Sequence, residues 1–239
     1  MKLNQDNYYS VEANQQFFSV SQYKDFMKCE AMALAKIRGE YRPAMTKAML
    51  TGSFVDTYFE GTLDSFMKEH PEVFTRKKEL RSEYRKANEI IQRVTEDKLF
   101  AQFMSGEKQR IMTFEMFGVP WKMKMDSYLP GICITDLKVV ANFRSLPLWR
   151  YDLQGAVYQE GVRLNTGEQL PFYLAVATKE RVTDLDIFQI TQPVLDIALR
   201  EVEMNIQHFM RVKEGLEDPS CCGKCDYCKG IKGAKIRDY

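Results

Sequence analysis

The sequence lacks any apolar run long enough to cross a membrane. A helix that spans a bilayer needs roughly 18 to 20 consecutive apolar residues, and charged residues, which make up 28% of this chain, interrupt every segment before that length. Residues 1–20 are polar and aromatic, without the short apolar core of a signal peptide. We therefore expect a cytoplasmic protein with no membrane contact.

Histidine and phosphate-binding loops are also scarce. The two histidines, His70 and His208, stand far apart in the sequence, so catalysis by a Ser–His or Cys–His pair has little support. No glycine-rich loop followed by Lys and Ser or Thr occurs, which argues against ATPase chemistry. The net charge is only +1, so a nucleic-acid partner would have to bind a local patch.

The composition that is present predicts a folded domain. Apolar residues make up 45% of the 239 positions, and neither an internal repeat nor a long linker divides them, so we expect a single domain. Hydrophobic spacing and capping residues predict a mostly helical part, 1–105, with helices at about 22–38 (N-cap Ser21), 45–60 and 79–98.

The remainder of the chain mixes strands and helices. Period-two segments and turn residues predict short strands within 108–140, 171–178 and 186–191, with helices at about 146–163 and 193–213. This order predicts an α/β (α+β) fold, in which a central mixed sheet of residues 106–215 is flanked by helices. A cysteine-rich tail, residues 216–239, follows it.

Two neighbouring predicted strands carry acids and a lysine. Strict alternation of polar and apolar residues from Trp121 to Asp126 predicts a strand, with Asp126 on its polar face. In the next predicted strand Asp136 and Lys138 are two residues apart, so their side chains share a face. A hairpin that turns at Pro130-Gly131 would bring Asp126 close to Asp136.

Two carboxylates with a lysine beside them suit metal-assisted phosphodiester hydrolysis. Carboxylate oxygens are the ligands that Mg²⁺ prefers in proteins, and Mn²⁺ accepts the same donors. Lys138 could orient the attacking water or neutralise charge on the phosphoryl group. The alternative is that these residues have no catalytic role: Asp126 and Asp136 would be turn and strand-end residues, and Lys138 would be solvated.

The order of the motifs resembles that of RecB-like PD-(D/E)XK nucleases, most closely the phage and prophage recombination exonucleases. The resemblance runs from about residue 20 to residue 228, through a Gly-Ser-Phe-Val-Asp segment ending at Asp56, then Asp126, Asp136-Leu137-Lys138, and Gln154-x-x-x-Tyr158. It implies a core like that of the restriction endonucleases, with a helical N-terminal region.

The same resemblance implies roles for these residues. Asp56, Asp126 and Asp136 would be ligands for Mg²⁺ or Mn²⁺, and Asp126, Asp136 and Lys138 would form the catalytic set. Gln154 and Tyr158, spaced to share one helix face, would contact the substrate. Many relatives carry His at the position of Asp56, and Glu is commoner than Asp at the position of Asp136; both departures keep a donor for a hard cation.

The activity implied by the resemblance is DNA hydrolysis. The chain would be a deoxyribonuclease, and within that class an exonuclease acting on double-stranded DNA ends in phage-type recombination. DNA would be its substrate and a single-strand annealing recombinase its protein partner, and a homo-oligomer is possible. The alternatives are a catalytically inactive nucleic-acid-binding module that retains the fold, and an endonuclease of the same fold.

Four of the six cysteines crowd into the tail, at 221, 222, 225 and 228. Thiols stay reduced in the cytoplasm, so this clustering favours metal ligation over disulfides. Several RecB-like nucleases hold a four-iron cluster with one N-terminal and three C-terminal cysteines. The resemblance thus implies a [4Fe–4S] cluster on Cys29, Cys222, Cys225 and Cys228; zinc on Cys221, Cys222, Cys225 and Cys228, or free thiols, are the alternatives.

Overall fold

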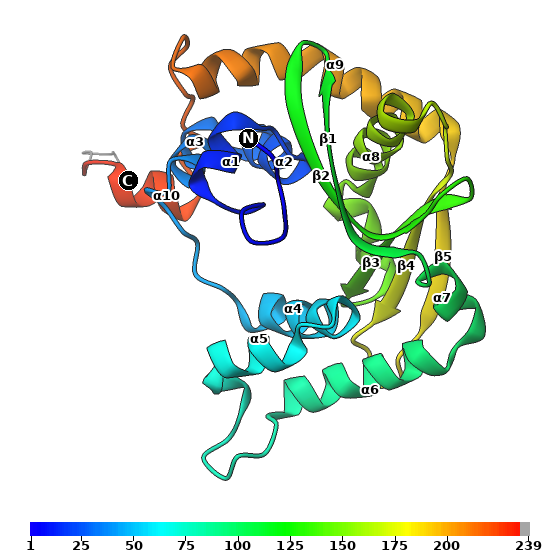
Figure 1. Cartoon of the computed structure of the whole chain (residues 1–239). Helices are drawn as coiled ribbons and strands as arrows, with labels where there is room; N and C mark the ends of the chain where they lie inside the picture. Colours follow the sequence, from blue (N-terminus) through cyan, green and yellow to red (C-terminus); the bar gives the residue numbers. More distant parts are fainter. Residues whose placement is uncertain (235–239) are drawn as a thin grey trace. The chain divides into compact units, whose positions relative to one another are not determined.

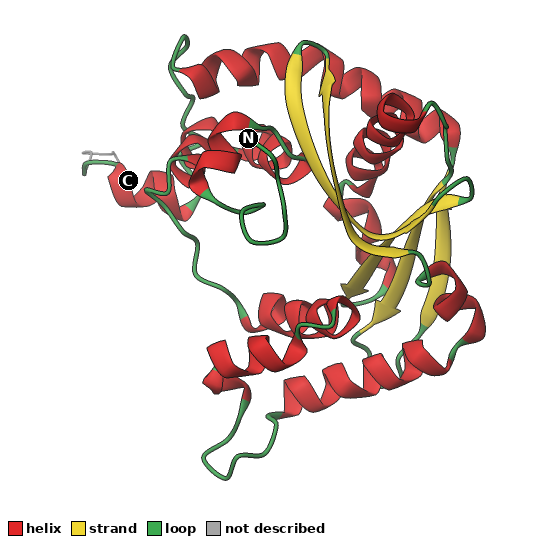
Figure 2. Cartoon of the chain, viewed as in Figure 1, coloured by secondary structure: helices red, strands yellow, loops and turns green. Residues whose placement is uncertain are grey.

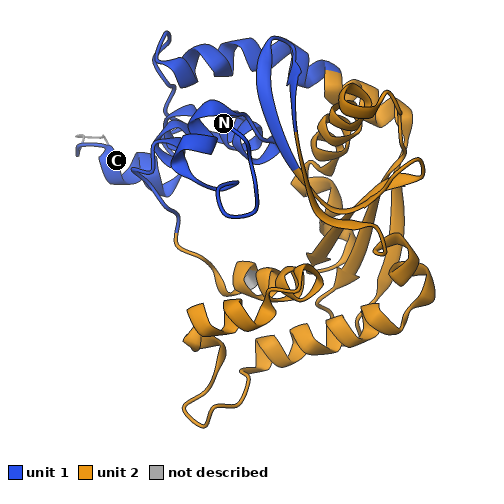
Figure 3. Ribbon diagram, in the orientation of Figure 1, with its two compact units in different colours: residues 1–43, 113–123, 200–239 blue, residues 44–112, 124–199 orange. Residues whose placement is uncertain are grey.

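The structure is a computed structural model that describes residues 1–234, apart from the side chain of residue 48. Its segments form two compact units that alternate along the chain (Figure 3). Unit 1 comprises residues 1–43, 113–123 and the chain from 200 onward, and unit 2 comprises residues 44–112 and 124–199. The assignment of the whole chain to one nuclease domain stays a prediction, and residues 235–239 of the predicted tail lie outside the described residues.

The strands form one five-stranded mixed sheet, ordered β1-β2-β3-β4-β5 (Figure 1). Its strands are β1 (Glu107–Met116), β2 (Val119–Leu129), β3 (Cys133–Val140), β4 (Phe172–Thr178) and β5 (Leu185–Ile190). Strand β3 pairs antiparallel to β2 and parallel to β4, and β4 pairs antiparallel to β5. The prediction of a mixed sheet flanked by helices is confirmed (Figure 2).

One face of β3 and β4 carries the apolar core of unit 2. Leu137, Ala175 and Ala177 on this face pack against helices α4 (Lys47–Glu60) and α6 (Ser82–Glu96). The buried positions of α6 recur at helical spacing, as expected for an amphipathic helix. Around this core lie α5 (Leu63–Glu69), the 3-10 helix η1 (Pro71–Val73) and α7 (Lys98–Phe103).

The opposite face of β4 is covered by helix α8 (Tyr151–Thr166), which is the crossover that a parallel strand pair requires. Gly155 lets this helix come close, because a Cβ there would lie 2.7 Å from the Phe172 ring and 2.8 Å from Leu195. The helix expected at 146–163 is split. The 3-10 helix η2 (Phe143–Trp149), which contains Pro147, precedes α8, and Arg150 joins them with a left-handed φ of 49°.

Unit 1 is built from short helices. They are α1 (Val11–Gln16), α2 (Val20–Lys28), α3 (Glu30–Ile37), the part of α9 (Gln192–Glu214) from residue 200 onward, and α10 (Asp226–Ile231). The single helix expected at 22–38 with Ser21 as N-cap is wrong. Ser19 caps the first helix through a 3.3 Å hydrogen bond from the Gln22 amide, and extended backbone at Cys29 (φ −171°, ψ 110°) separates the two.

The core of unit 1 is aromatic. Tyr23 and Phe26 of α2 each place their ring centroid 5.3 Å from that of Phe209 in α9, and Phe18 packs 5.7 Å from Trp121. Trp121, Tyr23 and Phe18 are completely buried. Burying one such side chain stabilises a fold by about 1.5–3 kcal/mol. Among the described helices, none combines the length and apolar character needed to cross a bilayer.

Candidate functional site

The β2–β3 hairpin expected from the sequence forms and brings two acids together. Ser127 pairs with Thr135, so Asp126 and Asp136 come next on the two antiparallel strands. Ser127 and Thr135 are the last paired residues on this side of the hairpin. Beyond them, the Leu137 amide donates to Asp126 Oδ2 at 2.9 Å. A side-chain carboxylate therefore takes a β3 amide that a regular ladder would pair with a backbone carbonyl. This hydrogen bond fixes the Asp126 carboxylate beside β3.

Asp136 is the buried centre of the candidate site. Its exposed fraction is 2%, and its carboxylate forms an ion pair with Lys138 on the same strand face, as the period-two spacing predicts. Gln154 Nε2, from helix α8, donates to Asp136 Oδ1 at 2.7 Å. Lys138 Nζ lies 5.5 Å from the centre of the Tyr151 ring, a cation–π contact. Each side of the Asp136 carboxylate is thus held by a specific group.

Helix α4 contributes two more acids, one turn apart. Asp56 interacts through its charge with Asp126, Asp136 and Lys138, so all the acids assigned by resemblance belong to one electrostatic cluster. Glu60 Oε1 lies 4.0 Å from Lys124 Nζ and is repelled by Asp126. The oxygen-donor set is therefore made by α4, β2 and β3 together.

Burial and like charges raise the pKa of Asp136 and of Asp56. Burial raises the pKa of Asp136 and repulsion from Asp126 adds to it, while Lys138 acts in the opposite direction. Burial, followed by the charge of Asp126, also raises the pKa of Asp56, although this residue keeps solvent-exposed surface. A bound divalent cation would relieve this repulsion, so the donor chemistry fits Mg²⁺ or Mn²⁺.

Lys138 is held in its charged form. Burial alone would lower the pKa of its ammonium group, but the charges of Asp136 and Asp126 outweigh that effect and raise the pKa above its usual value. At neutral pH the group is therefore a hydrogen-bond donor and a fixed positive charge. This favours stabilisation of negative charge on a phosphate over action as a general base.

Gln154 and Tyr158 lie on the face of α8 that is directed toward the site. The Tyr158 hydroxyl donates to the Lys124 carbonyl at 3.1 Å, and the residue is 8% exposed. Gln154 holds Asp136, as described above. Each residue thus donates a hydrogen bond to a strand of the site, and contact of either one with substrate stays a prediction.

Two further residues touch the site and were not predicted. Gln109 of β1 donates to Asp126 Oδ1 at 3.2 Å from a backbone with a left-handed φ of 51°, and nothing in the sequence pattern indicates that conformation. Tyr151, which faces Lys138, stands three residues before Gln154 and seven before Tyr158. This is helical spacing, so extending the predicted helix face by one turn would have found it.

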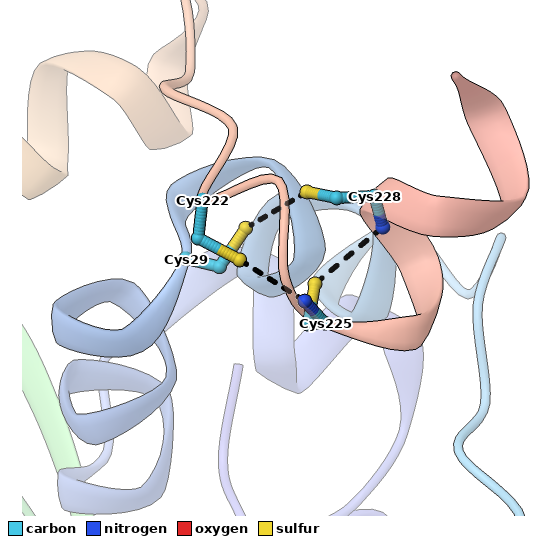
Figure 4. Close-up of side chains that lie close together, drawn as sticks. All are labelled: Cys29, Cys222, Cys225 and Cys228. Atoms are coloured by element: carbon cyan, nitrogen blue, oxygen red, sulfur yellow. Dashed lines mark hydrogen bonds between the residues drawn. The ribbon is translucent and has the colours of Figure 1, made fainter. Parts of the chain in front are cut away.

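The second candidate site is in unit 1, where four cysteines converge (Figure 4). The sulfur atoms of Cys29, Cys222, Cys225 and Cys228 all lie within 4.8 Å of one another. Among the residues described by the structure, this is the set of three or more Cys, His, Asp or Glu whose donor atoms meet this closely. Cys221 is exposed and outside the set, so the grouping implied by the resemblance forms and the one with Cys221 does not.

Comparison with protein families places residues 19–231 in the family described as a PDDEXK-like domain of unknown function (DUF3799). The match covers most of the chain, including both groups of side chains, and the chain belongs to this family. The predicted restriction-endonuclease-like class is thereby confirmed.

Among solved structures, the chain is similar to the crystal structure of a protein from Eubacterium rectale named "Putative exonuclease". The two share 46% identity with a TM-score of 0.97, over 100% of this chain and 97% of that one. The crystal structure of SSO0001 is 14% identical over 98% of this chain and 99% of that one, with a TM-score of 0.44. A search of the curated proteins gave no match.

Proposed function

We propose that this protein is a metal-dependent deoxyribonuclease that hydrolyses DNA phosphodiester bonds. The observation that carries the proposal is the coupled set on β2 and β3, in which Asp126 and Asp136 meet beside the charged Lys138. Membership of a PDDEXK-like family and likeness to a protein named as an exonuclease support the same chemistry. A purely structural role gives no reason for three mutually repelling acids around one lysine.

Asp126 and Asp136, with Asp56 from α4, would hold Mg²⁺ or Mn²⁺. The cation would supply an activated water and stabilise negative charge on the phosphate. Lys138 contributes a protonated amine beside Asp136 that stabilises charge on the phosphoryl oxygens. Gln154 keeps the Asp136 carboxylate in one orientation by occupying Oδ1. Such positioning matters because a small displacement of a catalytic group lowers the rate strongly.

Within this activity we propose an exonuclease that acts on double-stranded DNA ends, as the resemblance to phage recombination exonucleases implies. The similar protein from Eubacterium rectale is named as an exonuclease, which supports that part of the proposal and does not bear on double-stranded ends. A role in phage-type recombination, a single-strand annealing recombinase as partner, and a homo-oligomer are further parts of the proposal that rest on the resemblance alone.

The test is a cleavage assay on end-labelled linear duplex DNA and on covalently closed circular DNA, with Mg²⁺ or Mn²⁺. Wild type should shorten the linear substrate from its ends and leave the closed circle intact. Asp136→Ala and Lys138→Ala should both be inactive. Because the first change opens a buried position, Asp136→Asn is measured beside it, and thermal unfolding is recorded for each variant.

The outcomes separate the levels of the proposal. A wild-type protein that is inert on every substrate, or folded variants that cut as well as wild type, would remove the nuclease assignment. Cleavage of closed circles would retain the nuclease and replace the exonuclease with an endonuclease. DNA binding without cleavage would favour the inactive module.

A further inference from the structure

The four clustered sulfurs lie closer together than the ligands of a four-iron cube. All lie within 4.8 Å of one another, and Cys29 Sγ is 3.4 Å from Cys228 Sγ. One tetrahedral Zn²⁺ with Zn–S bonds of about 2.3 Å sets its sulfurs about 3.8 Å apart. In a [4Fe–4S] cube each cysteine binds a different iron, which sets the sulfurs roughly 6 Å apart. The spacing fits one tetrahedral ion and does not fit the cube implied by the resemblance.

Backbone amides hold two of these sulfurs in a turn typical of metal-binding thiolates. The amides of Lys224 and Cys225 donate to Cys222 Sγ at 3.4 and 3.3 Å, and the amide of Cys228 donates to Cys225 Sγ at 3.4 Å. Gly223 supplies the left-handed φ of 69° that the turn needs. Hydrogen bonds from N–H groups stabilise the charged form of a thiolate. Cys222-x-x-Cys225 is the ligand spacing of structural zinc sites.

Cys29 reaches the site because the chain is extended between α2 and α3. The Cys29 amide still makes a helical hydrogen bond to the Asp25 carbonyl, whereas the Ala31 amide donates to the Ser220 carbonyl at 3.1 Å instead of continuing the helix. Cys29 and Cys228 are 4% and 3% exposed, and Cys222 and Cys225 are partly buried, so the protein itself supplies four thiols at this position. A closed set of four protein ligands is the arrangement of a structural zinc site, whereas catalytic zinc keeps one position for water.

Hydrogen bonds beside the cysteines also connect the C-terminal segment to helix α3. Glu30, next to Cys29, accepts a 2.8 Å hydrogen bond from the Ser220 amide, and its other oxygen lies 2.7 Å from His208 Nε2. His208 Nδ1 lies 2.6 Å from Glu217 Oε2. The protein therefore fixes the backbone on both sides of the site. These contacts orient the segments that carry the ligands, as hydrogen bonds around a protein metal site do.

We propose that Cys29, Cys222, Cys225 and Cys228 bind one Zn²⁺ ion, which joins the N-terminal helices of unit 1 to the C-terminal segment. Four thiolates form a soft donor set that selects Zn²⁺ over Mg²⁺ or Mn²⁺. The ion has no open coordination position and no redox chemistry, so its contribution is to folding. This site is separate from the proposed nuclease site and does not depend on it.

The experiment measures the metal directly. The full-length protein is produced with both iron and zinc in the medium and purified without oxygen, so that an oxygen-sensitive cluster would survive. We expect one zinc per chain, neither iron nor acid-labile sulfide, and four sulfur neighbours at about 2.3 Å in zinc-edge X-ray absorption. Iron in place of zinc, with or without sulfide, or a protein without bound metal, would overturn the proposal.

Single substitutions identify the ligands. Cys225→Ser and Cys29→Ser should lower the zinc content to well below one per chain, whereas Cys221→Ser and Cys133→Ser should leave it unchanged. Because a ligand variant can fail to fold, wild type is also exchanged with Co²⁺, whose visible d–d absorption reports a tetrahedral thiolate site in the intact fold. Loss of zinc from Cys221→Ser, or cobalt spectra that show octahedral coordination, would contradict the assignment.

Discussion

The two sites hold their donor atoms in opposite ways. In unit 2 the acids come from α4, β2 and β3 and repel one another. Lys138 forms an ion pair with the Asp136 carboxylate, and Gln154 donates a hydrogen bond to it. In unit 1 four sulfurs already lie within 4.8 Å of one another, with Cys29 and Cys228 buried and Cys222 and Cys225 partly buried. The first arrangement retains a repulsion between carboxylates that a bound cation would relieve, and the second has its four donor atoms already close together. The repelling carboxylates of unit 2 therefore favour a catalytic role, and the converged cysteines of unit 1 favour a structural role.

Removal of zinc should give the largest effect, and the two units should respond to it differently. Structural zinc contributes on the order of 10 kcal/mol to the folding of small metal sites. We expect a strong chelator to abolish hydrogen-exchange protection in α3 and α10 while strands β3 and β4 keep theirs, because local stability follows local contacts. Hydrogen exchange with mass spectrometry measures this. Equal loss of protection in both units, or no change in either, would contradict the structural role that we propose for the cysteine site of unit 1.

Substitution of Asp126 should have the next largest effect, and on activity alone. Asp126→Asn keeps the size of the side chain and an oxygen for the Leu137 amide but removes a charge, so we expect the cleavage rate to fall about 10³-fold with little change in thermal stability. Asp186→Asn is the matched control, because Asp186 is exposed on β5 of the same sheet. Equal rates for the two variants would show that Asp126 is not part of the site.

A smaller effect should follow from loss of the glutamine that holds Asp136. Gln154→Met removes the donor to Asp136 Oδ1, and loss of such a supporting hydrogen bond costs about 10- to 100-fold in activity or metal affinity. Single-turnover kinetics would show a lower rate constant with unchanged DNA affinity. Weaker DNA binding at an unchanged rate constant would instead support the substrate contact that the resemblance implies for this residue.

The smallest expected effect is on the pH dependence of the free energy of unfolding, through Lys213 of unit 1. Lys213 donates to the Phe17 carbonyl at 2.8 Å, and burial, with the charge of Lys122 added, lowers the pKa of Lys213 to about 7. An unfolded lysine has a pKa near 10.5, so between pH 7 and 10.5 the unfolded chain binds more protons than the folded one. The free energy of unfolding contributed by this group therefore rises with pH across that window.

Lys213→Met should remove that rise. Urea unfolding of wild type and variant at pH 7 and pH 9 gives the comparison, because all other titrating groups are common to both proteins. We expect wild type to gain more stability than the variant between the two pH values. An equal change in both proteins would show that Lys213 is protonated in the folded state throughout.

Local patterns were enough for the parts of the site that depend on one strand or one helix. Strand parity placed Asp136 with Lys138, and a turn at Pro130-Gly131 placed Asp126 beside them. Helical spacing placed Gln154 and Tyr158 on one face. These residues need only the period of their own element and one hairpin.

Features set by distant contacts were beyond the sequence pattern. The break at Cys29 interrupts apolar spacing that would suit one helix, and the amide of Ala31 just after it donates to the carbonyl of Ser220, far along the chain. Gln109 reaches Asp126 only from a left-handed conformation within a strand, which its residue type does not require. The cysteine spacing suggested a metal, but the choice between cube and single ion depends on sulfur distances that only the fold sets.

The most direct test of the central claim is the rate of cleavage of linear duplex DNA by wild type and by Asp136→Asn while Mg²⁺ is titrated into cation-free protein. The proposed function predicts no cleavage without the cation, a rate that saturates with Mg²⁺ in wild type, and a rate at least about 10³-fold lower in the variant. Cleavage that is independent of divalent cation, or that the substitution leaves unchanged, would contradict it.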